Sequence, residues 1–508
     1  MNRGTIPLKG GMSRLALGLA LLALGPLKAG AVMADGGLWS RFFDGSKARP
    51  GLGLDAVASP AGLGSFGISD PRVRLLLSAD ESNRKAPVWP GYSVFGQPIL
   101  LYEDTKRSFL LAHPNPPAGY GAVLAYPRAV FEKAGAIFDL RADFEFHRLV
   151  NGIDTFAYRY EAGSNPAQDA RTIVHERFHV HQEKNFARLR FEQRRSEPDA
   201  EDLALAALEQ AALRGALESV GPLESSRLAR QFLAVRAERY GRRPDSRGLE
   251  DREERAEGMA EYVEQSLMNR PEVAPTDLGA IGEILRKLSQ FPSVDGMEKG
   301  RYYGTGSAQG LLLDRGGPKD WKERVAGGAC LRDVLALTYR VSVADEAALS
   351  AQAKGSLGYA ALLRQGSVEA AEFQRLKARA IADYDALPGL EWTVSVPWTP
   401  QTQFYNRSGQ PQFRLSDQEL LTPLLKTLDV RSEGFDFHAR DRPAVLGPNV
   451  RLHAALSAVV TLDGKPFTLG DGIYPFVSLT VKEAGLEVGI SRPGTLTVAG
   501  RKAVLSLR

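Results

Sequence analysis

A change in amino-acid composition and apolar spacing at Asn165-Pro166 constrains the fold of this 508-residue chain more than any other feature. From residue 166 to residue 388, long proline-free stretches are dense in Ala, Leu, Glu, Arg and Gln, which are strong helix formers. On either side of this region, short apolar runs alternate with polar residues between turn signals, a pattern typical of β-strands. We therefore expect an α+β protein whose mostly helical body, residues 166–388, is flanked by β structure.

The N-terminal flank, residues 92–165, is expected to form a small mixed β-sheet, because turn signals such as Asn151-Gly152 separate its apolar runs. A short helix is expected at residues 129–135. Residues 35–91 are rich in Gly, Pro and Ser, and we expect irregular structure around a few strands there. The expected strands of the sheet lie at residues 98–102, 108–112, 121–126, 143–149 and 155–160.

Two further regions follow along the chain. In the helical body, Gly221-Pro222 is expected to separate a pair of long helices. After residue 389, period-2 apolar runs and a hairpin turn at Asp463-Gly464 indicate a C-terminal β-sandwich-like domain, residues 389–508. The expected helices cover residues 199–219, 225–240, 250–268, 276–290, 302–313, 319–325, 330–339 and 367–386, and the expected C-terminal strand runs cover 452–462, 477–482 and 495–507.

Residues 1–34 have the composition of a secretory signal peptide. Basic residues come first, an apolar run covers residues 15–27, and small residues follow up to Ala34. The apolar run is shorter than the roughly 18 residues that a membrane span requires. We expect cleavage after Ala34, export to the periplasm or the cell exterior, and no transmembrane span in the mature chain.

The basic charge of the chain largely disappears with this leader. The full chain has 64 basic and 60 acidic residues, and residues 1–34 contain four basic residues and no acidic one. The mature chain would then hold 60 of each, so its charge gives no support for nucleic-acid binding. The single cysteine, Cys330, excludes an internal disulfide, and we expect it to be a small core residue in a helix.

The most informative motif is His175-Glu176-x-x-His179. On an α-helix, the two histidines are separated by about 40° around the axis, so both imidazoles can bind one metal ion. Glu176 lies about 100° from His175, where its carboxylate can act as a general base without ligating the metal. Val174 and Phe178 form an apolar i, i+4 pair that can anchor this helix in a core.

A catalytic zinc site needs a third protein ligand. Asn185 occupies the position, six residues after His179, at which a third histidine would be expected. His181 points about 200° away from His179 around the helix. We therefore expect a carboxylate from a distant helix. Residues 250–264 carry six glutamates, and the alternative interpretation is that these form the solvated face of a charged helix.

The segment Arg255-Ala-Glu-Gly-Met-Ala-Glu-Tyr-Val-Glu264 resembles the second zinc-binding motif of the gluzincin metallopeptidases. The resemblance implies that Glu257 is the third zinc ligand, with Glu254, one turn earlier, as its main competitor. The acid four residues after the ligand hydrogen-bonds the first motif histidine in that group, which implies this role for Glu261. Gly258 and Ala260 would let this helix pack close to the helix of the first motif.

A second segment, from Arg301 to Asp314, also resembles the gluzincins, in which a Tyr at the start of a Gly- and Ala-rich helix can face the active site. The resemblance implies that Tyr303, in preference to Tyr302, donates to the oxyanion of a tetrahedral intermediate. A structural Tyr is the alternative. The resemblance spans residues 92–335 and implies a zincin-like catalytic core. The chain departs from the family at Arg177, inside the first motif, and in the long helical insertion between the motifs.

These features predict an exported zinc metallopeptidase that binds one Zn2+ per chain and hydrolyses peptide or protein substrates, with Glu176 as general base. Two other functions use the same features. A zinc amidase acting on cell-wall peptides would have the same site residues. An exported binding or structural protein would keep a structural or vestigial zinc site and attach to its partner through the C-terminal β domain.

Overall fold

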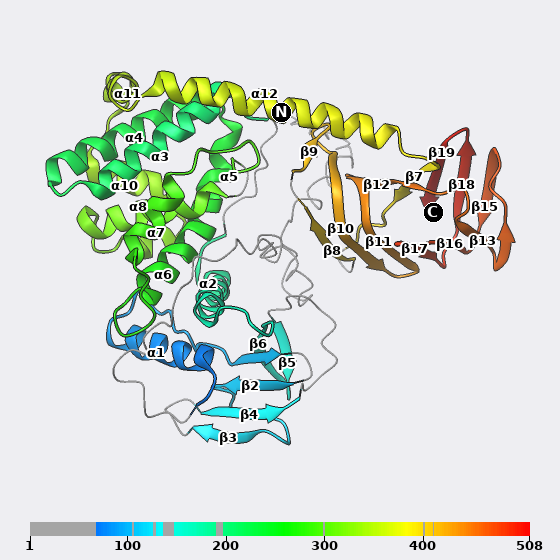
Figure 1. The fold of residues 1–508 in the computed structure, drawn as a ribbon, viewed down its shortest axis with the longest axis horizontal. Helices are drawn as coiled ribbons and strands as arrows, with labels where there is room; N and C mark the ends of the chain where they lie inside the picture. Colours follow the sequence, from blue (N-terminus) through cyan, green and yellow to red (C-terminus); the bar gives the residue numbers. More distant parts are fainter. Residues whose placement is uncertain are drawn as a thin grey trace, which may run out of the picture. The chain divides into compact units, whose positions relative to one another are not determined.

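The computed structural model describes residues 68–103, 106–124, 129–135, 147–188, 197–297, 300–399, 402–409 and 411–507. The expected signal peptide, residues 1–34, lies outside the described residues. The protein is mixed α+β, with a small N-terminal sheet, a helical body and a curled C-terminal sheet (Figure 1). The chain divides into two compact units, and the boundary between Leu376 and Lys377 falls within one long helix, α12 (Tyr359–Asp385).

The first described element is a helix, α1 (Pro71–Lys85), in a region where we expected irregular structure and strands. Asp70 caps this helix, because its carboxylate accepts a hydrogen bond from the backbone N–H of Arg72 at 2.8 Å. Pro71 occupies the first helical position, where a proline favours the start of a helix rather than breaking it. The expectation for this part of residues 35–91 was therefore wrong.

The N-terminal sheet is mixed, as the sequence predicts. Its six strands have the order β3-β4-β2-β1-β6-β5, in which β1 and β6 are parallel and the other pairs are antiparallel. The short helix expected at residues 129–135 is wrong, because β4 lies there and pairs with both β2 and β3. The strands are β1 (Ile99–Glu103), β2 (Arg107–Leu111), β3 (Gly121–Leu124), β4 (Val130–Ala134), β5 (His147–Val150) and β6 (Ile153–Arg159).

The helix that carries the histidine motif, α2 (Pro166–Asn185), follows the sheet directly. The side chain of Asn165 caps its N-terminus, and Pro166 occupies its first turn. Asp169 in that first turn accepts hydrogen bonds from Tyr158 of β6, at 3.2 Å, and from Arg72 of α1, at 2.6 Å. These contacts attach the start of α2 to both α1 and the sheet.

The rest of the body is helical. Gly221-Pro222 separates α3 from α4, as expected, whereas α11 was not expected; Ser342 and Asp345 form a capping box at its start. One expected helix, residues 250–268, is part of a longer continuous segment in which a single π-helical turn, η3, separates α5 from α6. The elements are α3 (Ala200–Glu218), α4 (Pro222–Arg242), α5 (Asp245–Glu253), η3 (Glu254–Gly258), α6 (Met259–Met268), α7 (Gly279–Leu288), α8 (Arg301–Gly316), α9 (Trp321–Ala326), α10 (Leu331–Tyr339) and α11 (Val343–Ser356).

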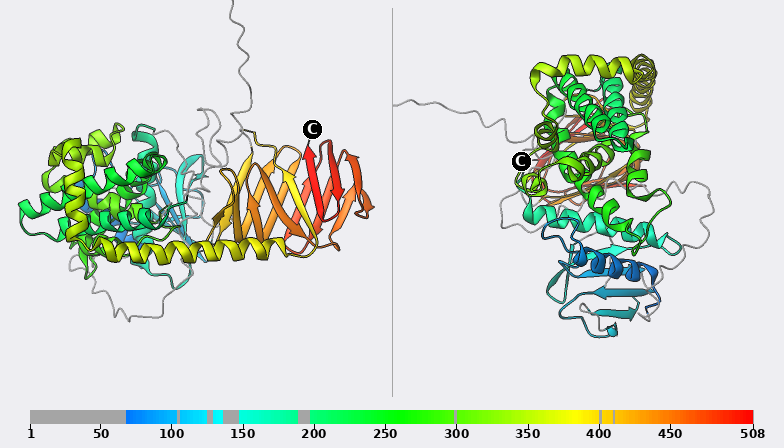
Figure 2. Two further views of the ribbon diagram at one scale, coloured as in Figure 1. Left: turned by 90° about the horizontal axis from the view of Figure 1, so that it is seen from above. Right: turned by 90° about the vertical axis from the view of Figure 1, so that its left-hand side faces the viewer.

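The C-terminal unit contains one 13-stranded sheet that curls around a single apolar core (Figure 2). We expected a sandwich of two sheets, but each strand here is hydrogen-bonded into one continuous sheet, and the long hairpin of β10 and β11 branches to β8 and β9. The strands are β7 (Leu390–Ser395), β8 (Gln403–Ser408), β9 (Phe413–Arg414), β10 (Leu420–Ser432), β11 (Phe435–Leu446), β12 (Asn449–Ala454), β13 (Val459–Leu462), β14 (Lys465–Phe467), β15 (Gly472–Phe476), β16 (Leu479–Glu483), β17 (Leu486–Ile490), β18 (Gly494–Ala499) and β19 (Lys502–Leu507).

No described helix has both the length and the apolar character that crossing a membrane requires.

Candidate metal centre

The three motif residues of α2 lie on a buried part of the helix. His175, Glu176 and His179 are each less than 5 % exposed. Val174 and Phe178 are completely buried in the main core, so the predicted apolar anchor of this helix is confirmed. Phe178 packs edge-on against Trp89, with ring centroids 5.3 Å apart. The packing of α2 therefore holds the two imidazoles in one orientation, on the side of the helix that faces η3.

Glu257, on η3, reaches both imidazoles. Its Oε2 atom lies 3.3 Å from Nε2 of His175 and 3.5 Å from Nε2 of His179. The donor atoms of these three residues all lie within 4.8 Å of one another. Two imidazole nitrogens and one carboxylate oxygen, converging in this way, can hold a metal ion. Glu176 does not belong to this group of donors, which among the described residues has only these three members.

The outer nitrogens of both histidines are held by hydrogen bonds. Nδ1 of His175 lies 3.2 Å from Oε2 of Glu264, and Nδ1 of His179 lies 2.7 Å from Oε1 of Gln182. Both partner atoms are acceptors, so each Nδ1 carries a hydrogen and each Nε2 is directed at Glu257. Such outer hydrogen bonds orient imidazole ligands and raise their basicity.

The residue that hydrogen-bonds His175 differs from the expected one. The family resemblance implied Glu261, but the bond is made by Glu264, and Oε2 of Glu261 instead lies 2.7 Å from Nζ of Lys287. Gln265 donates to both carboxylates, at 2.9 Å to Glu261 and 3.0 Å to Glu264. Lys287 belongs to α7, so the partner of Glu261 depends on the position of a helix that is remote in sequence.

Burial and charge shift the pKa values of the site carboxylates in opposite directions. Burial raises the pKa of Glu176 to about 7, because the desolvation of its carboxylate outweighs the attraction of the two histidines. Burial also raises the pKa of Glu257, but the adjacent His179 and His175 outweigh it, so this pKa lies well below its usual value. At neutral pH Glu257 is therefore ionised and suited to ligation, whereas Glu176 can both accept and release a proton.

Of the two candidate tyrosines, Tyr303 lies at the site. Its ring stacks on the ring of His175, with centroids 5.7 Å apart and planes at 25°. Burial raises the pKa of the Tyr303 phenol well above its ordinary value, and a hydrogen bond to Glu257 raises it further. Tyr302 points elsewhere, because its hydroxyl donates to the backbone carbonyl of Met297. The proposed oxyanion role of Tyr303 stays a prediction.

A close helix approach places Glu257. A Cβ atom added to Gly258 would lie 2.5 Å from the Cα atom of Gly306, and one added to Gly306 would lie 2.6 Å from the Cα atom of Gly258. Only glycine at both positions lets η3 and α8 come this near. The close approach that we expected Gly258 to allow toward the helix of the first motif is made instead toward α8. This approach brings Tyr303, on α8, next to Glu257.

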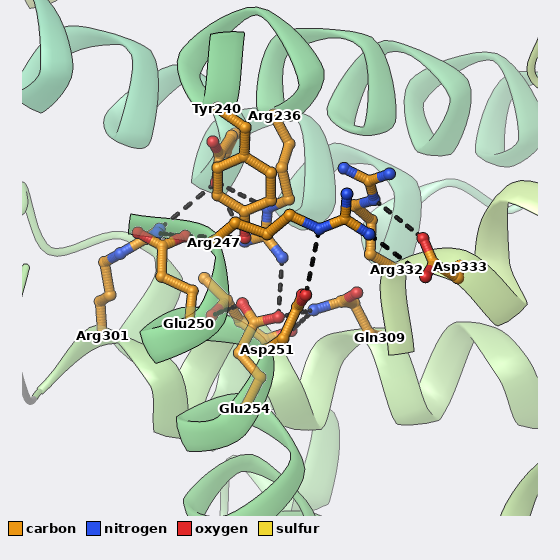
Figure 3. A network of polar contacts seen from close by, with 12 residues as sticks. Arg236, Tyr240, Arg247, Glu250, Asp251, Glu254, Arg301, Gln309, Arg332 and Asp333 are labelled. Carbon is orange, nitrogen blue, oxygen red and sulfur yellow. Dashed lines mark hydrogen bonds and ion pairs between the residues drawn. The ribbon is translucent and has the colours of Figure 1, made fainter. Parts of the chain in front are cut away.

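Glu254, the expected competitor of Glu257, is part of a different cluster (Figure 3). Its Oε2 atom lies 2.7 Å from Nη1 of Arg236, and its Oε1 atom accepts from Thr305 at 2.6 Å. We call the surrounding residues the arginine network. It consists of three glutamates and three arginines, with side chains at most 2 % exposed: Glu209, Glu250, Glu254, Arg236, Arg239 and Arg301. Glu254 is committed to this network, which leaves Glu257 as the carboxylate at the histidines.

Arg177, the departure from the family inside the first motif, has a structural role. Its Nη1 atom donates to Oε1 of Gln97 at 2.6 Å, and its Nε atom donates to the carbonyl of Val94 at 3.2 Å. These bonds attach α2 to the segment that precedes β1. His181 stacks on Phe178 and bonds Asn185, so it lies away from the metal centre, as expected.

Sequence reasoning missed two residues of the centre, Glu264 and Gln182. Gln182 lies three residues after His179, and this spacing places both side chains on one helix face. That signal was present in the sequence. Glu261 and Glu264 lie four and seven residues after Glu257, and both spacings place a side chain on the same helix face as Glu257. The spacing therefore does not show which of the two hydrogen-bonds His175.

The comparisons with known proteins found no relative for this chain. No family model, no curated protein and no solved structure matches it. The function proposed below therefore rests on the geometry of the candidate metal centre.

Proposed function

We propose that this protein is a zinc metallopeptidase of the gluzincin type with a zincin-like core. The observation that supports this most is that one buried site holds three metal-ligand side chains and, next to them, a carboxylate that is not a ligand. His175, His179 and Glu257 present three ligand atoms to a common point, and Glu176, next to the first histidine, remains outside the ligand set. Three protein ligands and an open fourth position are typical of catalytic zinc, whereas structural zinc is bound by four.

Zinc fits this donor set better than a hard cation. Two imidazoles and one carboxylate are a borderline-soft set, whereas calcium and magnesium select oxygen ligands. A zinc ion at this site would supply Lewis acidity toward a water molecule and the scissile carbonyl.

The chain's own residues would then perform the proton transfers. The carboxylate of Glu176 accepts a proton from the attacking water and delivers it to the leaving amine nitrogen. A pKa near 7 suits both halves of this task, because the group can be deprotonated before attack and protonated after it. The phenol of Tyr303, which a raised pKa keeps protonated, donates a hydrogen bond to the carbonyl oxygen as negative charge develops there.

The same centre supports a zinc amidase acting on cell-wall peptides, for which substrate profiling is the test. A structural or vestigial zinc site in an exported binding protein is less well supported. Such a site gives no reason to bury the carboxylate of Glu176 beside a set of only three ligands. Export of the mature chain, after removal of residues 1–34, is part of this proposal.

The test is metal analysis and peptide hydrolysis on three matched variants. Glu176→Gln should retain one zinc per chain and lose about 10²- to 10⁴-fold in turnover of a peptide library. Glu257→Gln should lose tight zinc binding. Glu183→Gln is the control, because Glu183 is an exposed glutamate of the same helix.

Each outcome discriminates between the functions. Wild-type protein without zinc, or zinc content in Glu257→Gln equal to that of wild type, would overturn the metal site. Full turnover in Glu176→Gln would remove the general base. Zinc binding without hydrolysis of any peptide or amide would favour the binding protein.

A further inference from the structure

Gln182 joins the two helices that carry the metal ligands. It lies on α2, one turn after His179, and is 8 % exposed. Its Nε2 atom lies 3.0 Å from the carbonyl oxygen of Arg255 and 3.0 Å from that of Ala256. Both carbonyls belong to η3, immediately before Glu257. One side chain of the histidine helix is thus bonded to the main chain that presents the third ligand.

These contacts determine the orientation of the amide. Carbonyl oxygens only accept, so the group that faces Arg255 and Ala256 must be the NH2 group of Gln182. The amide oxygen must then face His179, whose Nδ1 lies 2.7 Å away. Since that oxygen is an acceptor, Nδ1 of His179 carries the hydrogen. When the ring is neutral and its hydrogen is on Nδ1, the lone pair of Nε2 lies on the side of Glu257.

We propose that Gln182 is a positioning residue that sets the tautomer of His179 and holds the main chain of η3 beside it. The π-helical turn gives this second task its setting. A π-turn replaces the regular i to i+4 bonding of an α-helix by i to i+5 bonding and is rare outside functional sites. Within the helix the carbonyl of Ala256 accepts from the backbone N–H of Met259, and the amide of Gln182 adds a donor from a second helix to this carbonyl and to that of Arg255. Gln182 supplies two donors at the residues that precede Glu257. The part of this proposal that concerns zinc affinity rests on the proposed function, and the part that concerns the tautomer does not.

Two variants separate the two tasks. Gln182→Met has a similar shape and removes both the acceptor and the donors. Gln182→Glu keeps an acceptor for Nδ1 of His179 but cannot donate to the carbonyls of η3. Asn185→Leu is the matched control, because Asn185 is an amide on the last turn of the same helix whose bonds, within the described part of the chain, go to His181.

Three measurements are made on each variant. Zinc affinity is obtained by competition with a chromogenic chelator. The tautomer of His179 is obtained from long-range ¹⁵N–¹H correlations of the metal-free protein at alkaline pH, where the ring is neutral. The stability of η3 is obtained from hydrogen exchange of its backbone amides, and thermal unfolding shows whether each variant is folded.

The expected results differ for each variant. Gln182→Met should bind zinc about 10- to 100-fold more weakly and lose the Nδ1–H tautomer of His179. The backbone amide hydrogens of η3 should exchange faster in this variant. Gln182→Glu should keep the tautomer, exchange faster in η3 and bind zinc with intermediate affinity. Asn185→Leu should match wild type in all three measurements.

The proposal is overturned if wild-type His179 carries its proton on Nε2, or if folded Gln182→Met matches wild type in zinc affinity and exchange. If Gln182→Met does not fold, the comparison of Gln182→Glu with wild type still decides the role of the donors. If wild-type protein binds no zinc, the proposed function fails, and the tautomer and exchange data still test Gln182.

Discussion

Each histidine of the metal centre uses its two ring nitrogens for different purposes. Nδ1 of His175 bonds Glu264 and Nδ1 of His179 bonds Gln182, while both Nε2 atoms face Glu257. The outer partners differ in charge, because Glu264 is a carboxylate and Gln182 is a neutral amide. His175 is therefore the more basic of the two ligands and should gain most from its partner.

A substitution at Glu264 tests this outer partner. Glu264→Gln should weaken zinc binding by about 10- to 100-fold, since its new NH2 group would meet the NH2 group of Gln265 or Nδ1–H of His175. Glu261→Gln should have a smaller effect, because Glu261 pairs with Lys287. Chelator competition measures both affinities. A larger loss in Glu261→Gln would show that the family pattern holds and that the observed partner is wrong.

At the scale of elements, the segment from α5 through η3 to α6 organises the site. It is one continuous helical segment, and its π-turn contains both Glu254 and Glu257, which contact different groups of residues. Glu254 is bonded to the arginine network and Glu257 faces the histidines. The mutual approach of Gly258 and Gly306 holds this turn against α8.

Filling this approach should disturb both stability and metal binding. Gly258→Ala places a Cβ atom 2.5 Å from the Cα atom of Gly306, so the helices must move apart. Overpacking of this kind costs about 1–3 kcal/mol in the free energy of unfolding, and here it should also weaken zinc binding. Urea denaturation and chelator competition are the measurements. Gly241→Ala is the control, because its added Cβ atom would meet no described atom within 4 Å apart from its chain neighbours and the adjacent backbone of α4, and it should be neutral or slightly stabilising.

At the scale of the molecule, the helical body contains a fully buried and charge-balanced group, the arginine network. It joins α3, α4, α5, η3 and α8. Figure 3 labels Arg236, Glu250, Glu254 and Arg301 of this network. Burial raises the pKa of Glu250, but Arg239 and Arg301 outweigh it, and the pKa lies well below its ordinary value. Arg239 and Arg236 likewise lower the pKa of Glu209 against the effect of burial.

These shifts predict how the stability of the body depends on pH. A carboxylate whose folded pKa is depressed contributes stability above its unfolded pKa of about 4.3 and loses it as the pH falls toward the folded value. The free energy of unfolding of zinc-free protein should therefore decrease below about pH 4.3. Glu250→Gln should be less stable at neutral pH and less dependent on pH in this range. Urea denaturation, followed by the circular dichroism signal of the helices, measures both. If the free energy of unfolding of the variant depended on acid pH as strongly as that of wild type, the attribution to Glu250 would be wrong.

Glu224→Gln is the control for this experiment. Glu224 pairs with Arg227 on the exposed surface of α4, where salt bridges contribute little. Its pKa is lowered chiefly by the hydrogen bond from Arg227, so it shares the direction of the shift without the burial. This variant should follow the wild-type pH profile.

The sequence by itself determined the features that depend on local geometry. The order of β and helical regions follows from the composition and from the spacing of apolar residues. The common face of His175 and His179, with Glu176 about 100° away from His175, follows from the helical repeat. These residues are close because they are close along the chain. One local signal was missed, because Asp70 and Pro71 start α1 in a region whose Gly, Pro and Ser content led us to expect irregular structure.

Only the tertiary structure decided which residues of distant elements meet. Helical spacing did not choose among the six glutamates of one helical segment, of which the family resemblance favoured Glu257. The positions of α2, α4 and α7 placed Glu257 at the histidines, Glu254 at Arg236 and Glu261 at Lys287. Residues 129–135 became a strand because β2 and β3 pair with them on both sides. In each case the deciding free energy comes from partners remote in sequence, which no local pattern specifies.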